Sequence, residues 1–298
     1  KKTTRFLAGF RGTQGEWDWE TAILHSKAVS NDVTLNRISN TLLQEALYDS
    51  TSAAFNIFSI DSTNIERALV DVYRNDESVL SLWDFKAIDE EIFSLPAGPV
   101  AMLVGFEYRK ESYADDRDPR LDGTIAFVAD NGGTFPFVSD VLGSSPTTDA
   151  SGSKNTISFF TEFQIPVTEK IQAQLAVRHE DISDAGTATV GKLAVGYNVA
   201  EGLLLRGSTQ TAFRAPNLVQ VNQLEVARAG TRVDAVYQYI GGSDKDVRDY
   251  DWSIQRYASG ADKLVPEEST NSSIGLVLDP AMFLDGSSPM AEILDGLT

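Results

Sequence analysis

The stretch VAMLVGFEYRKESY, residues 100–113, decides the fold class of this chain. Apolar residues recur at every second position from Val100 to Tyr108, and the positions between them end in Glu107 and Arg109. Strict alternation of this kind indicates a β-strand with one apolar and one polar face.

The same alternation recurs along the chain, in pairs of segments joined by short turns. We expect nine strands, at residues 3–12, 17–27, 83–95, 100–113, 154–166, 171–182, 189–199, 203–213 and 268–279. The turns near 12–16, 95–99, 166–170 and 199–202 are short, whereas the connections 28–82, 114–153 and 214–266 are long and polar, with the short loop 183–188 an exception. The pattern predicts an all-β, antiparallel up-and-down sheet with short turns at one end and long loops at the other.

Alternation alone does not say whether the apolar face meets lipid or a second sheet. Asymmetric loops, strands of about ten residues and aromatics near strand ends are typical of a transmembrane β-barrel. Trp17, Trp19 and Tyr197 are such aromatics. The alternative is a soluble or surface β-sandwich, for example a carbohydrate-binding module, whose apolar face packs inward.

Composition excludes several classes of function. The chain has 298 residues, no cysteine and a formal net charge of −18. Cysteine chemistry and disulfides are therefore absent, and nucleic acid is an unsuitable partner for so acidic a chain. We also find no phosphate-binding loop, no Gly-x-Ser-x-Gly and no dinucleotide fingerprint. We expect neither an enzyme nor a cofactor.

The acidic excess is unevenly distributed. Residues 28–82 and 114–153 each carry a net charge of −5, and residues 267–298 carry −6. We interpret the acidity as a property of the connections, with a nearly neutral strand framework.

Several stretches, in order, resemble one family. The segment Leu204–Ser208, followed by Phe213-Arg214-Ala215-Pro216-Asn217, is similar to an element of the TonB-dependent receptors of Gram-negative outer membranes. Further matching stretches are Leu95–Val100 with Gly105–Arg109, Phe163–Pro166 with Leu175–Asp181, and Leu264–Ser269 with Gly275-Leu276.

The resemblance implies a transport function in the outer membrane of a Gram-negative bacterium. Such a receptor binds and imports a scarce solute, for example a siderophore, vitamin or oligosaccharide, without chemistry on it. Its implied partners are outer-membrane lipid, the solute, and an inner-membrane TonB coupling complex that acts through a plug domain.

The family's plug and closing strands have no counterpart here. We expect residues 1–280 to form a partial barrel, and we leave the divergent acidic tail 281–298 unassigned. An open sheet of nine strands would expose two unpaired edges to lipid. The simplest interpretation is an internal or truncated piece of a longer receptor.

The polar face offers candidate site residues. Because successive strand residues point to opposite faces, the positions between the apolar residues are expected to face the lumen. They include Arg11, Asp18, Glu107, Arg109, Glu162, Arg178, Glu180, Lys192 and Arg206. If Trp19 pairs with Phe10, Arg11 lies opposite Asp18, and Glu180 is likewise expected opposite Lys192. Each cross-strand pair would contribute about 0.2–1 kcal/mol, and charges neutralising one another is the simpler role for them.

The remaining candidates lie in the connections. Pro216 should end its strand, and Arg214, in the loop 214–266, is a candidate ligand contact, although a structural role for this element is the simpler one. We predict no metal site, because His25 and His179 fall on separate strands of the apolar face. The acidic group Asp115, Asp116, Asp118 and Asp122 is expected in a solvated surface loop, since its spacing matches no calcium loop.

Overall fold

The computed structural model describes residues 1–59, 64–183, 185–224, 226–233, 239, 251–258 and 264–278. Its nine principal strands are β1 (Lys2–Gln14), β2 (Trp17–Ile38), β3 (Leu69–Leu95), β4 (Gly98–Arg117), β5 (Ala150–Thr168), β6 (Ile171–Ile182), β7 (Gly186–Ala200), β8 (Leu203–Arg214) and β11 (Glu267–Leu278). All nine predicted strands are present, so the alternation identified them correctly.

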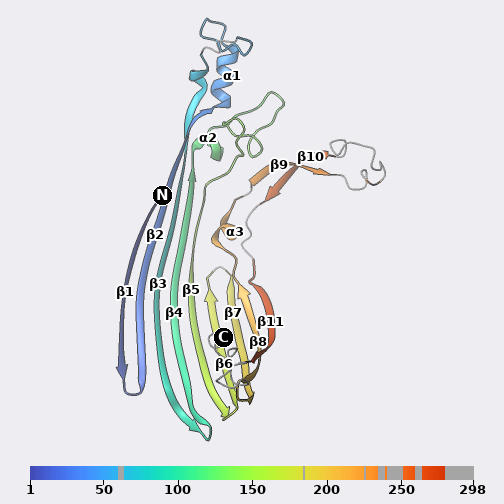
Figure 1. The fold of residues 1–298 in the computed structure, drawn as a ribbon. Helices are drawn as coiled ribbons and strands as arrows, with labels where there is room; N and C mark the ends of the chain where they lie inside the picture. Colours follow the sequence, from blue (N-terminus) through green and yellow to red (C-terminus); the bar gives the residue numbers. More distant parts are fainter. Residues whose placement is uncertain are drawn as a thin grey trace, which may run out of the picture.

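The nine strands form one antiparallel sheet in the order β1-β2-β3-β4-β5-β6-β7-β8-β11. Figure 1 shows the long strands β1 to β5 side by side, with the shorter β6, β7, β8 and β11 beside them. A separate ribbon pairs β9 (Val226–Val233) with β10 (Asp251–Ala258). In the described part of the chain, β1 has only β2 as a neighbour and β11 has only β8, so the sheet is open.

The two ends of the sheet differ as predicted. The turns at the lower end in Figure 1 are short, and the connections β2–β3, β4–β5 and β8–β11 emerge at the other end. The connection from β6 to β7 is short and belongs to the long-loop end. The first hairpin closes with Gln14 opposite Trp17, and Gly15 takes the positive φ of 63° that this two-residue turn requires.

Strands β2, β3 and β4 are longer than predicted, at 22, 27 and 20 residues. A bilayer needs only about 9–11 strand residues, so these strands extend far beyond that length. Val29 faces Glu77 and Asp32 faces Arg74 within the supposed loop 28–82. Some acids of the segment 28–82 therefore lie in paired strands, and the interpretation of acidity as a property of the connections is partly wrong. Backbone pairing between strands does not require one face to be apolar, so the alternation did not reveal these extensions.

Short helices occupy the long-loop end. They are α1 (Asn40–Tyr48), the 3₁₀-helix η1 (Ile65–Ala68), α2 (Pro119–Asp122) and α3 (Leu218–Asn222). Ser39 caps α1 by accepting from the Leu42 amide. Of the helices in the described residues, none has the length and apolar character needed to cross a membrane.

One face of the sheet is apolar and uncovered. Phe10, Phe159, Ile274 and Leu276 on this face are 73%, 57%, 82% and 64% exposed. Within the described residues all nine strands belong to one sheet, and no second sheet packs on this face. This arrangement contradicts the sandwich alternative, which required a buried apolar face.

Candidate functional site

Strand register sorts the side chains into two faces. One row of paired residues runs across strands β1 to β5 on the apolar face. In strand order its members are Phe10, Thr21, Phe85, Phe106 and Phe159. The predicted lumen-facing set lies on the opposite face, which we call the polar face: Arg11, Asp18, Glu107, Arg109, Glu162, Arg178, Glu180, Lys192 and Arg206. That this face lines a lumen stays a prediction.

Both predicted charge pairs on the polar face are out of register. Arg11 lies opposite Glu20, and Asp18 lies opposite Thr13, whose hydroxyl donates to it at 2.6 Å. The cause is the first turn, which has two residues rather than the four expected, and this shifts the pairing by two positions.

The second predicted pair fails for the same kind of reason. Glu180 faces Ala188 and Lys192 faces Ala176. Strand β7 begins at Gly186, immediately after a shorter connection than the predicted loop 183–188. The pairing is therefore displaced by four positions.

Arg178 contacts four other side chains of the polar face. We call these five residues the central cluster: Glu107, Ser158, Phe160, Arg178 and Glu180. The Arg178 guanidinium donates to Glu180 at 2.5 Å and to the Ser158 hydroxyl at 3.0 Å, and lies 3.4 Å from Glu107. It also stands 5.2 Å from the Phe160 ring centroid. Glu180 is only 5% exposed, so the guanidinium offsets the cost of burying that carboxylate.

The ring of Phe160 occupies space that a glycine leaves open. A Cβ placed on Gly105 would lie 2.1 Å from the ring. Arg178 lies over the same ring, so the aromatic side chain is held between the β4 backbone and a guanidinium. The absent side chain at Gly105 is thus a requirement of the central cluster.

Towards the long loops, Asp115 is held by two arginines. Arg74 donates to its two carboxylate oxygens at 2.9 and 3.0 Å, and Arg117 donates at 2.8 Å. Asp115 and Asp116 belong to β4 rather than to a surface loop, which corrects the prediction for half of the acidic group.

The other acids of that group bind locally. Asp116 accepts from Asn75, Asp118 caps α2, and Asp122 accepts from the Thr124 amide. The described residues contain no group of three His, Asp or Glu side chains suited to a metal ion. His25 and His179 lie on the apolar face, where they meet the hydroxyls of Ser81 and Thr189.

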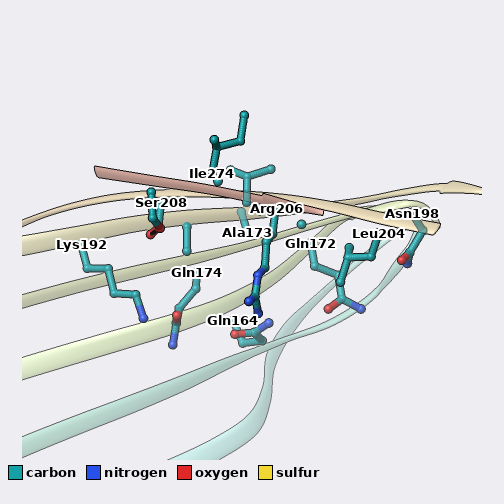
Figure 2. A pocket seen from close by; sticks show the side chains of 16 residues that line it. Gln164, Gln172, Ala173, Gln174, Lys192, Asn198, Leu204, Arg206, Ser208 and Ile274 are labelled. Carbon is teal, nitrogen blue, oxygen red and sulfur yellow. Dashed lines mark hydrogen bonds between the residues drawn. The ribbon is translucent and has the colours of Figure 1, made fainter. Parts of the chain in front are cut away.

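At the short-turn end the polar face is hollowed into a basin of about 510 Å³. Figure 2 shows Gln164, Gln172, Gln174, Lys192 and Arg206 pointing to one side of the sheet, and Ile274 to the other. The floor is made of small residues, among them Ala194, Gly196, Ser208 and Gly275. The lining includes two cations and no acid.

The segment after β8 folds back over the polar face. Strand β8 ends at Arg214, and Pro216 follows as predicted, its carbonyl accepting from Lys154 at 3.0 Å. Asn217 and Gln220 cap α3 reciprocally, and Asn222 lies against Gly152 of β5. The sequence analysis did not predict that this segment lies over the polar face. The Asn-x-x-Gln capping box would have indicated the helix itself.

Arg214 itself lies at the end of a strand rather than within a loop. It is exposed and faces Glu267 of β11. A ligand role for Arg214 stays a prediction.

A buried carboxylate joins two long connections. Asp140, fully buried, accepts from the Ser39 hydroxyl at 2.8 Å, from the Thr41 amide at 2.7 Å and from Arg120. Burial raises the pKa of Asp140, but these hydrogen bonds outweigh it and lower that pKa below its usual value. Asp49, held by Arg67 at 2.6 Å and by Thr51, has its pKa lowered to about 2.

Solved structures share this fold. The siderophore receptor PirA from Acinetobacter baumannii matches 92% of this chain at 16% identity and a TM-score of 0.56, over 32% of its own length. A variant of the ferric enterobactin receptor PfeA from Pseudomonas aeruginosa matches 92% at 15% identity and a TM-score of 0.53, over 32% of its length. The RagAB peptide transporter matches 92% at 14% identity and a TM-score of 0.52, over 27% of its length. The chain spans about a third of the first structures it matches.

A family comparison covers almost the whole chain. The model described as "TonB dependent receptor-like, beta-barrel" matches residues 2–288. The open, two-faced sheet is therefore a transmembrane β-barrel segment, and the chain belongs to the TonB-dependent receptor β-barrel family.

Proposed function

We propose that this chain forms part of the barrel wall of an outer-membrane receptor that binds and imports a scarce solute in a Gram-negative bacterium. The observation that carries the proposal is the pairing of an exposed apolar face with a charged, hydrogen-bonded polar face on the same nine strands. The apolar face would meet outer-membrane lipid, and the polar face would line the solute's path.

The proposal includes the parts of the receptor that complete the wall. Lipid provides no hydrogen bonds for an open sheet edge, so we infer that further strands pair with β1 and β11. A plug domain would fill the lumen and respond to an inner-membrane TonB coupling complex. The match to only about a third of the solved relatives supports this inference.

The solute is proposed to pass chemically unchanged. Siderophore, vitamin, oligosaccharide and peptide are the classes we consider. In the polar face, the charged side chains of the central cluster bind one another and leave no obvious group for acid–base work.

Uptake by a deletion strain tests the proposal. The gene would be deleted in the source bacterium, and uptake of a labelled ferric siderophore, vitamin, oligosaccharide and peptide would be compared at limiting concentration. We expect one class to lose uptake, and a protonophore to abolish the same uptake in the parent strain while surface binding persists. Unchanged uptake of all four classes, or uptake insensitive to the protonophore, would contradict it.

A further inference from the structure

The basin differs in charge from the rest of the polar face. Its two cations, Lys192 and Arg206, have no carboxylate oxygen within 4.0 Å among the described residues. Glu162 on β5 lies two strands away from Lys192, with Ala176 between them, and its carboxylate accepts a hydrogen bond from the Gln174 amide. In a chain of net charge −18, two cations of one hollow that lack a carboxylate partner among the described residues are available for an anion.

The backbone makes room around the Arg206 guanidinium. Arg206 faces Gly196 on β7 and Gly275 on β11, so both of its lateral neighbours are glycines. Its side chain lies across Gly275, where an added Cβ would come within 3.1 Å of Nε. The absent side chain at Gly275 thus lets the Arg206 side chain lie against the β11 backbone, while Leu204 borders the space above Gly196.

Neutral hydrogen-bonding groups surround the cations. Gln164 and Gln172 are exposed at the rim, and Asn198 lies beside them in the lining. Amides donate and accept equally well, so they suit a solute with mixed oxygen groups. A volume of about 510 Å³ is in the range of small-molecule sites.

We propose that the basin is a binding site for a carboxylate-bearing solute, with Arg206 as the principal contact and Lys192 as the second cation. A guanidinium binds a carboxylate through two parallel hydrogen bonds, whereas an ammonium acts as a point charge. The inference rests on the proposed function, because it takes the polar face as the wall of the solute's path.

Equilibrium binding of citrate tests the site without requiring transport. The full protein, extracted in detergent from the source cells, would be titrated calorimetrically with citrate and with its neutral trimethyl ester at low salt. We expect citrate to bind and the ester to bind at least about tenfold more weakly. Arg206→Gln should weaken citrate binding about tenfold or more, Arg206→Lys less, and Lys192→Gln about threefold.

Lys86→Gln is the matched control. Lys86 is also a cation on the polar face, but it is already paired with Glu20 at 3.0 Å. This variant should bind citrate like the unmodified protein, which separates a local site from a general loss of positive charge. Migration of unheated samples as a compact band would establish that each variant is folded.

Three results would overturn the proposal. They are equal binding of citrate and its ester, citrate binding unchanged in Arg206→Gln, and no citrate binding by the unmodified protein together with capture of a polypeptide segment by a photo-crosslinker at position 206. The outcome is distinguishable from that of the uptake experiment, because citrate binding that depends on Arg206 would stand even if the deletion strain imported every solute normally.

Discussion

The central cluster and the basin share one face of the sheet but treat charge in opposite ways. In the central cluster Arg178 meets two carboxylates, a hydroxyl and an aromatic ring. In the basin Lys192 and Arg206 stand over small residues without an acid in the lining. A cation placed on the polar face by the alternation can therefore either stabilise the sheet through carboxylate partners or remain free to bind a ligand. The side chains on the adjacent strands determine which of the two occurs.

Filling the space beneath Phe160 should have the largest effect on the free energy of unfolding, because it disturbs the central cluster and leaves the basin unchanged. Gly105→Ala places a Cβ where the ring lies, so we expect a loss of about 3 kcal/mol in the free energy of unfolding. Gly191→Ala is the control, since its Cβ would meet only Ala176 at an ordinary 3.5 Å. Denaturant unfolding followed by the shift between compact and unfolded gel bands measures both, and an equal effect of the two substitutions would refute the role of Gly105.

Removing the cation of the central cluster should have the next largest effect. Arg178→Gln leaves Glu107 and Glu180 without their guanidinium, and we expect a loss of about 2 kcal/mol, moderated by water at the partly exposed Arg178. The added substitution Glu180→Gln should recover part of the loss, since it removes the uncompensated charge. If the double variant were less stable than Arg178→Gln alone, the paired account would fail.

The same kind of substitution in the basin should barely change stability. Lys192→Gln and Arg206→Gln remove cations without carboxylate partners among the described residues, so we expect each to stay within about 0.5 kcal/mol of the unmodified protein. The same unfolding measurement serves here. A loss comparable to that of Arg178→Gln would mean that the basin cations are structural as well.

The smallest expected effect is a local response to pH in the loops. The pKa of Asp49 is lowered from 3.8 to about 2, so its contribution is present above about pH 4 and is lost as the pH falls towards 2. Its carboxylate accepts from the Thr51 amide at 2.8 Å. Exchange of that amide, corrected for its intrinsic rate, should accelerate over this range, and Asp49→Asn should remove the pH dependence.

The alternation predicted the strands and the faces because both follow from a period of two. Register did not follow, because it depends on turn length: the shift of Arg11 from Asp18 to Glu20 arises from two turn residues instead of four. The extension of β2 and β3 was also missed, since polar residues on both faces interrupt the alternation there, such as Asn31 against Asn75 and Asp32 against Arg74.

Contacts that depend on tertiary arrangement were beyond the pattern. Arg178 on β6 reaches Glu107 on β4 across the intervening strand β5, so the contact joins two strands that are not neighbours in the sheet. Ser39 and Asp140 meet across 101 residues. The recess around Arg206 arises because Gly196 and Gly275 pair with it from two different strands, and only the register brings them together.

The central claim is that the apolar face of this sheet meets lipid and the polar face meets water. Because the chain has no cysteine, single cysteines can carry a spin label at successive positions of β7 from Lys192 to Tyr197, in protein reconstituted into bilayers. Collision rates with oxygen should peak at Leu193, Val195 and Tyr197, and rates with a water-soluble nickel chelate should peak at Lys192, Ala194 and Gly196. The absence of a two-residue period, or the opposite phase, would contradict the account.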